Sequence, residues 1–248
     1  MKQTRDLWNM PITVEIVAPR VPALIWDRVY DYFRFIDRKF STYKRASEIS
    51  LINRGELAPE QYSPEMKEVL QLAERTRRDT LGFFDIREGE RLDPLGLVKG
   101  WAVFRAAKTL RGEGFSNFYI EAGGDIEASG VNNRDKPWKI GIRNPFNKTE
   151  IVKVVYLKDR GIATSGNYER GRHIRNPLNG KWAEGIASVT VIGPNVYEAD
   201  RFATAAFAMG PRGINFLATC PALAGYMIEN NGRAVYTSNF QKYLTEDA

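Results

Sequence analysis

Apolar residues recur along the first part of the chain with two different periods. Ile12, Val14 and Ile16 stand at every second position, which is the spacing of a half-buried β-strand. Over 25–40 the apolar positions instead recur every third or fourth residue, which predicts an amphipathic helix with one buried face. We interpret 47–53, SEISLIN, as a short connecting piece. The pattern therefore predicts a strand, a helix and a connection, in that order.

Capping residues mark the beginning of two further helices. Ser63 and Pro64 combine an N-cap residue with a first-turn proline, so a helix is expected to begin there. Asp93 and Pro94 give the same signal for a helix that ends between residues 112 and 114, where glycines follow. The first half of the chain is therefore expected to be mainly helical.

Strand patterns dominate the second half of the chain, with helices before and between them. Helices are predicted over 196–209, which Gly210 ends, and near 214–219. A hairpin around Asn231-Gly232 is expected near the C-terminus. The predicted strands cover 118–122, 125–131, 138–142, 152–157, 186–192, 225–230 and 233–237. This order favours an α+β fold over a regular βαβ series.

Length and cysteine content narrow the class of protein. A chain of 248 residues forms one large domain or two small ones, and a single domain over 1–248 is the simpler interpretation. Cys220 is the only cysteine, so an internal disulfide is impossible. No stretch approaches the ~18 apolar residues of a membrane span, and residues 1–20 lack a signal-peptide core. We therefore expect a protein without a membrane span that stays in the cytoplasm.

The formal net charge of +6 favours an anionic ligand. The 36 Lys and Arg residues are scattered among 30 Asp and Glu, and no basic block with interleaved aromatic residues occurs. A small molecule that bears phosphate is therefore expected as ligand, and no nucleic-acid partner is expected.

We expect the stretch 161–180 to be a loop that contributes to a site. It is rich in glycine and other turn-forming residues, and it carries His173, the only histidine. Arg170, Arg172 and Arg175 surround this histidine in sequence, and nearby positive charge disfavours the protonated imidazole. A neutral imidazole near pH 7 is the form that a general base needs. His173 is therefore a candidate catalytic base, while a lone histidine also fits a structural role.

Asp200 and Thr204 form a candidate metal-binding pair. They are four residues apart in a predicted helix, so they share one face, and small residues surround them. A carboxylate and a hydroxyl are hard oxygen donors suited to Mg²⁺, which binds few protein oxygens together with waters or phosphate. The alternative is purely local: a threonine bonded back into its helix and an aspartate favoured by the helix dipole.

Two other segments could hold an anion. Lys99 lies one turn into the helix that begins near Asp93, where unpaired N–H groups and the ammonium could face one phosphate. This segment is not a P-loop, since G-x-x-x-x-G-K-[ST] is absent. The residues Gly123-Gly124-Asp125 are a second candidate, with a plain hairpin turn as the alternative. They do not form a dinucleotide fingerprint either.

The order of these segments resembles the ApbE family, the FAD:protein FMN transferases. The resemblance runs from about Met10 through the helix at 196–210, and more loosely through the final hairpin. The combination of ADxxAT, ATSG and HI(x)(D/N)P in this order is far more specific than any one piece. The matching stretches are STY at 41–43, SEISLIN at 47–53, GFFD at 82–85, LDPLGLVKGWA at 92–102, EAGGD at 121–125, ATSGNYERG at 163–171, HIRNP at 173–177 with Gly180, and EADRFAT at 198–204.

The resemblance implies a T-fold-like α+β domain with a mostly antiparallel sheet and flanking helices. It also implies Mg²⁺ bound by Asp200, Thr204 and a backbone oxygen near Gly96, and His173 as the catalytic base. FAD is the implied substrate, with Met10 and Tyr43 on its adenine side. The residues expected to contact FAD are Met10, Tyr43, Phe83, Phe84, Asp85, Asp93, Lys99, Thr164, Ser165, Gly166, Ile174 and Ala203.

Several positions depart from the family pattern. Met10-Pro11-Ile12 replaces the usual Met-Gly-Thr, and Phe83 stands where alanine is usual. Asn176 replaces a common aspartate, and Arg172 replaces a frequent second histidine. Many family members are exported lipoproteins, so the lack of a signal here implies an acceptor protein in the cytoplasm.

The implied reaction moves FMN from FAD to a Thr or Ser hydroxyl of an acceptor flavoprotein and releases AMP. Two alternatives remain open. The first is an Mg²⁺-dependent FAD pyrophosphatase, in which water takes the place of the hydroxyl and free FMN and AMP form. The second is an FAD-binding protein without turnover, which the altered pocket residues keep open.

Overall fold

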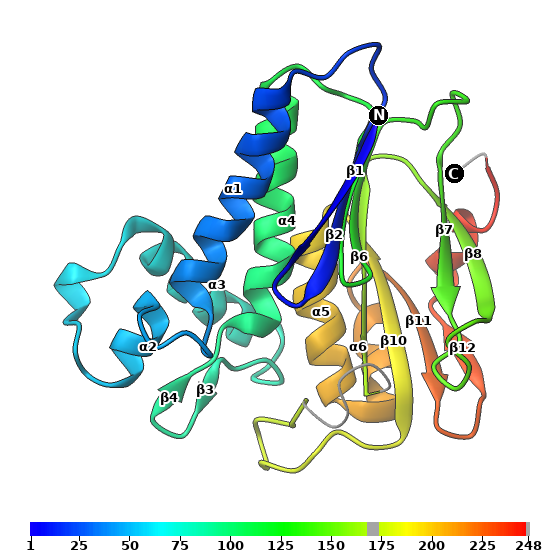
Figure 1. Cartoon of the computed structure of the whole chain (residues 1–248). Helices are drawn as coiled ribbons and strands as arrows, with labels where there is room; N and C mark the ends of the chain where they lie inside the picture. Colours follow the sequence, from blue (N-terminus) through cyan, green and yellow to red (C-terminus); the bar gives the residue numbers. More distant parts are fainter. Residues whose placement is uncertain (168–173, 247–248) are drawn as a thin grey trace.

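A single antiparallel sheet organises the computed structural model, which describes residues 1–167 and 174–246 (Figure 1). Among these residues, eight strands follow the order β1-β2-β5-β6-β9-β10-β11-β12, and all neighbours are antiparallel. The strands are β1 (Lys2–Leu7), β2 (Met10–Ile16), β5 (Phe118–Ala122), β6 (Asp125–Ser129), β9 (Arg160–Gly166), β10 (Ile186–Gly193), β11 (Ala224–Glu229) and β12 (Ala234–Tyr236). Two smaller antiparallel pairs are β3 (Arg87–Glu88) with β4 (Arg91–Leu92), and β7 (Trp138–Arg143) with β8 (Ile151–Leu157).

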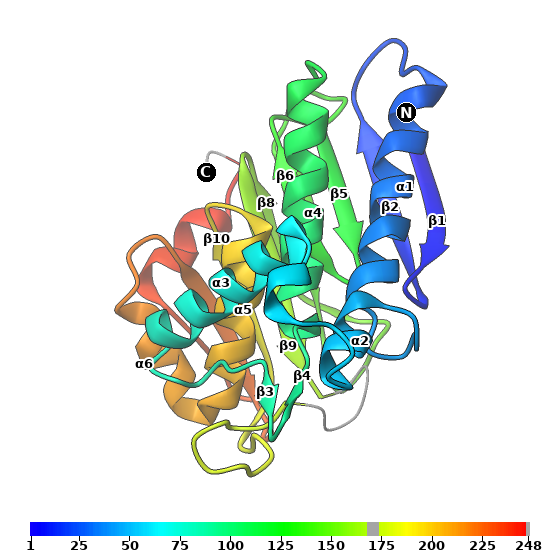
Figure 2. The same cartoon turned by 90° about the vertical axis from the view of Figure 1, so that its left-hand side faces the viewer.

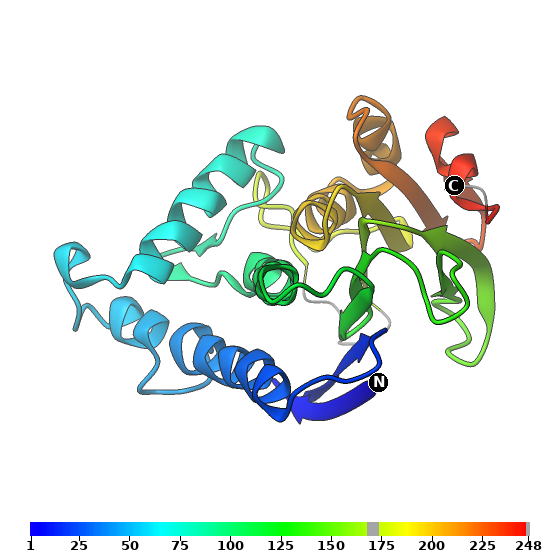
Figure 3. The ribbon, with the colours of Figure 1, turned by 90° about the horizontal axis from the view of Figure 1, so that it is seen from above.

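Helices cover one face of this sheet and the β7–β8 pair covers the other (Figures 2 and 3). Seen from above, α1, α4 and α5 lie against the sheet, while α2 and α3 lie farther out (Figure 3). The helices are α1 (Ala23–Phe40), α2 (Glu48–Asn53), α3 (Pro64–Asp79), α4 (Leu95–Gly112), α5 (Val196–Ala208) and α6 (Gly213–Ala218). Short 3₁₀ helices occupy Pro59–Gln61, Gly210–Arg212 and Ser238–Tyr243. The arrangement confirms the predicted α+β class with a mostly antiparallel sheet and flanking helices.

The apolar stripes of the helices build the core on their side of the sheet. Phe33 of α1 and Trp101 of α4 are buried in one cluster with strands β2 and β5. Phe207 of α5 belongs to a second cluster with β9, β10 and β11. A third cluster, which includes Trp138 and Phe240, fills the space between the sheet and the β7–β8 pair. None of the helices in the described ranges combines the length and the apolar character that crossing a bilayer requires.

The prediction of a loop over 161–180 is wrong for its first part. Arg160–Gly166 is β9, an interior strand that pairs with β6 and β10. Its small residues serve the approach of α5: a Cβ at Gly161 would lie 1.9 Å from the backbone nitrogen of Val196. Glycine in a strand can mark such a close backbone approach, and sequence alone does not distinguish this from a turn. The remainder of this stretch that the structure describes, from Ile174 onward, contains turns and the isolated bridge between Arg175 and Trp182.

The connecting piece at 47–53 is also corrected, because it contains helix α2. Ser47 caps the helix by accepting the N–H of Ser50 at 3.2 Å. The Glu48 carboxylate accepts from the backbone N–H and the hydroxyl of Ser63, both at 2.7 Å. A helix of six residues is too short to be stable alone, so these tertiary contacts decide its conformation.

Other boundaries differ by small amounts. Strand β1 was not predicted, and α4 begins at Leu95 while the Asp93 carboxylate accepts the Leu95 N–H at 3.0 Å. Ser63 caps α3 as predicted, with its hydroxyl 3.2 Å from the N–H of Met66. The turn at Gly123-Gly124 joins β5 to β6 with φ of 58° and 90°, a conformation that favours glycine.

Candidate active site

Asp200 and Thr204 lie one turn apart in α5, on the side of the helix that faces α4 and β9. Asn195 begins the helix by accepting the N–H of Glu198 at 2.9 Å. The Asp200 side chain is buried, with a residue exposure of 4%, and Thr204 is half-buried. The hydroxyl of Thr204 lies 3.4 Å from the hydroxyl of Ser165 on β9. Two oxygen donors on α5 therefore meet a third on the neighbouring strand.

The first turns of α4 form the opposite wall of this cluster. The N–H of Gly100 donates to Oδ2 of Asp200 at 2.9 Å. A Cβ at Gly100 would lie 2.7 Å from the Cβ of Asp200, so the two helices could not approach this closely with a larger residue. At Gly96 a Cβ would lie 3.5 Å from the Phe84 ring and 3.7 Å from the Thr204 methyl group. Two glycines one turn apart in α4 thus allow close packing: Gly96 faces Phe84 and Thr204, and Gly100 faces Asp200.

An ion pair joins α4 to the first residue of β6. The Lys99 ammonium is 2.6 Å from Oδ2 of Asp125, the residue that follows the Gly123-Gly124 turn. Asp125 has no exposed surface, and its other oxygen lies 3.4 Å from the backbone N–H of Thr164. The Thr164 hydroxyl is 2.8 Å from that of Thr190 on β10. A buried carboxylate of this kind requires its cation, because an unpaired buried charge is costly.

The donors around Asp200 fit Mg²⁺ in the form that this ion takes in proteins. The N–H of Gly100 donates to Asp200, and Gly96, one turn earlier in α4, faces the methyl group of Thr204. The carboxylate of Asp200 and the hydroxyl of Thr204 therefore lie beside the backbone of the first turns of α4. Over 1–167 and 174–246, no three His, Cys, Asp or Glu side chains are grouped to hold a metal. Such a partial set suits Mg²⁺, which keeps waters or takes oxygens from a bound phosphate.

The residues around this cluster match the model of one protein family. The ApbE family model covers residues 9–90 and 87–227. The chain belongs to the ApbE family. The resemblance found from the order of the motifs is thereby confirmed.

Curated relatives in the ApbE family carry the name FAD:protein FMN transferase. The relative from Escherichia coli K12 is 31% identical over 162 residues, which are 60% of this chain and 46% of the relative. The relative from Haemophilus influenzae is 32% identical over 168 residues, which are 62% of this chain and 49% of the relative. The matches therefore span about half the length of these relatives.

Solved structures of ApbE proteins share the fold over almost the whole chain. The ApbE protein from Thermotoga maritima has a TM-score of 0.87 at 22% identity, with 99% of each chain covered. The flavin transferase ApbE from Vibrio cholerae has a TM-score of 0.85 at 21% identity, with 98% of this chain and 99% of that chain covered. At this level of identity the likeness establishes the fold alone.

The ApbE motif residues on α4, α5 and β9 gather in one region. Asp200, Thr204, Gly96, Ser165 and Phe84 are joined by the contacts described above. Ala203 is buried between Asp200 and Thr204 in the second core cluster, and Ile174 packs against that cluster from the segment that follows residue 173.

Four further residues that were expected to contact FAD have other neighbours: Met10, Tyr43, Phe83 and Asp85. The Met10 sulfur contacts Gly123, where a Cβ would lie only 2.8 Å from it, so Met10 lies over the turn before Asp125. Tyr43 is 89% exposed in the connection between α1 and α2. The Asp85 carboxylate accepts from Nε of Arg87 at 3.1 Å. The half-buried ring of Phe83 packs against the first core cluster.

The predicted base, His173, lies outside the described residues, as do Arg170 and Arg172. Gly166 ends β9 and is buried. The roles assigned to the site residues, including His173, therefore stay predictions.

Two buried carboxylates of the site region were not among the predicted site residues. Asp125 was named only within the Gly123-Gly124-Asp125 segment, a candidate anion site, although it also ends the EAGGD stretch that matches the family. Glu127 on β6 accepts the backbone N–H of Val196, the first residue of α5, at 2.7 Å and an N–H of Arg111 at 2.8 Å. Burial raises the pKa of Glu127, against the lowering effect of Arg111 and the Val196 N–H. The alternation along DIEAS could have indicated that both carboxylates are buried, because residues two apart in a strand lie on the same face.

Proposed function

We propose that this protein is an Mg²⁺-dependent FAD:protein FMN transferase. Its substrate is FAD, its products are AMP and an acceptor flavoprotein with FMN on a Thr or Ser hydroxyl. Membership of the ApbE family supports this function. The observation that carries it is the contact of Asp200 and Thr204 with the glycine-rich first turns of α4, which brings a carboxylate and a hydroxyl beside the backbone of that helix.

The residues of the cluster suit the binding of a pyrophosphate. Asp200, Thr204 and the backbone oxygen of Gly96 would hold Mg²⁺, which when bound neutralises charge on the pyrophosphate oxygens and polarises the phosphorus. The Ser165 hydroxyl, 3.4 Å from that of Thr204, is placed to donate a hydrogen bond to a phosphate oxygen. Lys99 maintains the GGD turn through Asp125 and adds positive potential at the start of α4. Such a transfer depends mainly on positioning and on stabilisation of charge.

His173 is proposed as the general base. A Thr or Ser hydroxyl is a weak nucleophile at neutral pH, so removal of its proton during attack assists the reaction. The proton passes from the acceptor hydroxyl to the imidazole, the new bond joins the hydroxyl oxygen to the FMN phosphorus, and AMP leaves with the bridging oxygen. Such assistance contributes about 10²–10⁴-fold in rate.

The test combines purified protein, FAD, Mg²⁺ and an acceptor protein of the Escherichia coli relative. We expect a fluorescent acceptor band on a denaturing gel, an acceptor mass increased by FMN, and release of AMP in equal amount. The variant His173→Ala is expected to bind FAD as the wild type does and to transfer FMN about 10²–10⁴-fold more slowly. Equal transfer by this variant would remove His173 from its role.

The same experiment distinguishes the two alternatives. Free FMN and AMP, with an unlabelled acceptor, would indicate an FAD pyrophosphatase. Bound FAD without release of AMP in the presence of Mg²⁺ would indicate a flavin-binding protein without turnover. Either outcome would overturn the proposed transferase function.

A further inference from the structure

Arg201, the residue after Asp200, has a buried guanidinium group between α5 and α3. Its side chain is 3% exposed. Nε and Nη2 donate to Oε2 of Glu198, one turn earlier in α5, at 2.9 and 2.5 Å. Nη1 donates to Oδ2 of Asp79, the last residue of α3, at 2.9 Å. Arg201 therefore links the helix of the proposed metal pair to the end of a helix 122 positions away in sequence.

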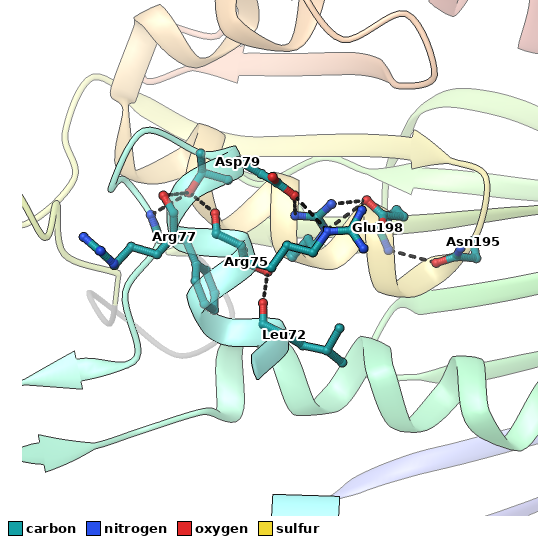
Figure 4. Close-up of polar contacts among 10 residues, drawn as sticks. Leu72, Arg75, Arg77, Asp79, Asn195 and Glu198 are labelled. Carbon is teal, nitrogen blue, oxygen red and sulfur yellow. Dashed lines mark hydrogen bonds and ion pairs between the residues drawn. The ribbon is translucent and has the colours of Figure 1, made fainter. Parts of the chain in front are cut away.

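The network around Arg201 is larger than one ion pair. Figure 4 shows Asp79, Arg75 and Arg77 at the end of α3, opposite Glu198 in α5 and Asn195, the residue that caps α5. Arg75 lies 3.5 Å from the same oxygen of Asp79 that Arg201 contacts. The Arg201 guanidinium also lies over the Phe202 ring, 4.3 Å from its centroid. A charge this deeply buried is retained only where every partner is in place, so the relative position of the two helices is closely defined here.

Asp79 leads directly to the segment that carries Phe83 and Phe84. Thr80 follows it, donates its hydroxyl to the carbonyl of Thr76 at 2.7 Å, and accepts the N–H of Phe84 at 3.2 Å. The ring of Phe84 in turn faces Gly96 of α4, which the methyl group of Thr204 also faces. The contacts thus form a closed circuit, which runs from Arg201 in α5 through Asp79 and the segment 80–84 to Gly96 in α4, and from Gly96 back to Thr204 in α5.

We propose that Arg201 is a positioning residue for FAD. It determines how far the Phe83–Phe84 segment lies from the Asp200 and Thr204 pair, so that the flavin-lining and pyrophosphate-binding parts are correctly spaced. This inference rests on the proposed function, since it assumes that FAD spans these two parts. The guanidinium of Arg201 contacts Glu198 and Asp79, so its proposed effect on FAD passes through Asp79 and the segment 80–84.

The matched control is Lys39, which makes a similar bridge elsewhere. Its ammonium lies 2.5 Å from Glu65 and 3.5 Å from Glu48, and its side chain is 17% exposed. Lys39 connects α1 to α2 and to the N-terminal end of α3, whereas Arg201 contacts the C-terminal end of α3. The variant Lys39→Met therefore removes a bridge of two ion pairs and leaves the circuit intact.

The experiment compares wild type, Arg201→Met, Arg201→Lys and Lys39→Met. FAD affinity is measured by quenching of flavin fluorescence, and Mg²⁺ affinity by calorimetry without FAD. We expect Arg201→Met to weaken FAD binding about tenfold and to lower kcat/KM for FAD on the order of 10². Mg²⁺ affinity should stay within a factor of about two, because the proposed effect passes through Asp79 and the segment 80–84, which carry none of the proposed metal donors. Arg201→Lys keeps the charge but not both contacts, so it should recover part of the FAD affinity.

Lys39→Met is expected to melt at a lower temperature while it binds FAD as the wild type does. The proposal is overturned if Arg201→Met binds FAD like the wild type, if Lys39→Met loses as much affinity, or if Arg201→Lys recovers none. Should Arg201→Met fail to fold, Asp79→Asn keeps the shape, removes one charge from a side chain that is 35% exposed, and should show the same weakened FAD binding. FAD binding without FMN transfer by the wild type would overturn the proposed function, and the affinities would still decide this inference.

Discussion

The buried carboxylates of the sheet and of α5 have distinct roles that follow from their partners. Asp200 accepts the N–H of Gly100, lies one turn from Thr204 in α5, and is proposed as a metal donor. Asp125 is paired with Lys99 and supports a turn. Glu127 holds the first N–H of α5 and the guanidinium of Arg111. At the scale of single residues, the three buried carboxylates therefore differ in the groups that they contact.

Glu127 should give the stability of the protein a recognisable dependence on pH. Burial raises its pKa above the ordinary 4.5, so the folded chain binds this proton more tightly than the unfolded chain. Its contribution is fully present below about pH 4.5 and is lost as the pH rises through the higher folded pKa. The free energy of unfolding of the wild type, minus that of Glu127→Gln, should therefore fall with rising pH in this window.

Urea unfolding at a series of pH values measures that difference. Glu74, whose pKa is lowered by hydrogen bonds from Arg77, provides a control of opposite sign on the surface. For Glu74→Gln the corresponding difference should rise with pH until the ordinary pKa of a glutamate is reached, and should then stay level. The rise should be small because the pair is exposed. A difference for Glu127 that stays level or rises would contradict the raised pKa.

At the scale of elements, the site exists because three elements approach one another at glycines. α5 lies against β9 at Gly161 and against α4 at Gly100, and at both positions a Cβ would overlap atoms of α5. Glycine inside a helix or strand lowers the stability of that element, and the close packing that it permits offsets this loss here. The positions of Asp200 and Thr204 therefore depend on residues that carry no side chain of their own.

The variant Gly161→Ala tests this dependence. The new Cβ would lie 1.9 Å from the Val196 nitrogen, a backbone atom that cannot rotate away, so α5 must move. We expect a loss of about 3 kcal/mol in the free energy of unfolding, together with weaker Mg²⁺ binding. Gly112→Ala is the control, since nothing lies within 4 Å of a Cβ at the end of α4, and it should gain about 0.5–1 kcal/mol. Thermal and urea unfolding measure both, and an unchanged Gly161→Ala would refute the close approach.

At the scale of the whole molecule, the proposed ligands should stabilise the fold together. FAD would contact segments before and after α4, and Mg²⁺ would join α4 to α5, so each ligand organises the site of the other. Binding to the folded chain alone raises the melting temperature, and ligands that share phosphate oxygens are coupled reciprocally. A joint effect is thus a signature of one shared site.

We expect the shift in melting temperature with FAD and Mg²⁺ together to exceed the sum of the two separate shifts. Asp200→Asn should keep the shift caused by FAD alone and lose the excess, because the amide is a poorer donor to Mg²⁺. Differential scanning fluorimetry or calorimetry with each ligand and with both provides the measurement. Additive shifts in the wild type, or an unchanged excess in Asp200→Asn, would place the metal elsewhere.

Much of the secondary structure was determined by the sequence alone. The stripe of apolar residues over 25–40, the cap at Ser63 and the alternation from Phe118 to Ser129 are local patterns, and each became the expected element. The shared face of Asp200 and Thr204, the proposed metal pair, was predictable for the same reason, because residues four apart in a helix lie on one face. The order of the motifs was sufficient to identify the ApbE family.

Only the tertiary structure decided which segments lie together. β9 is an interior strand because α5 packs on its glycine, and α2 is a helix because Glu48 binds Ser63, neither of which is a local property. The partners of Lys99 and Arg201 could not be predicted from sequence either. From sequence alone, a charged side chain is expected to be exposed. In the fold, Asp125 lies beside Lys99 and Asp79 lies beside Arg201. Periodicity encodes the faces of single elements, whereas contacts between distant elements arise from packing of the whole chain.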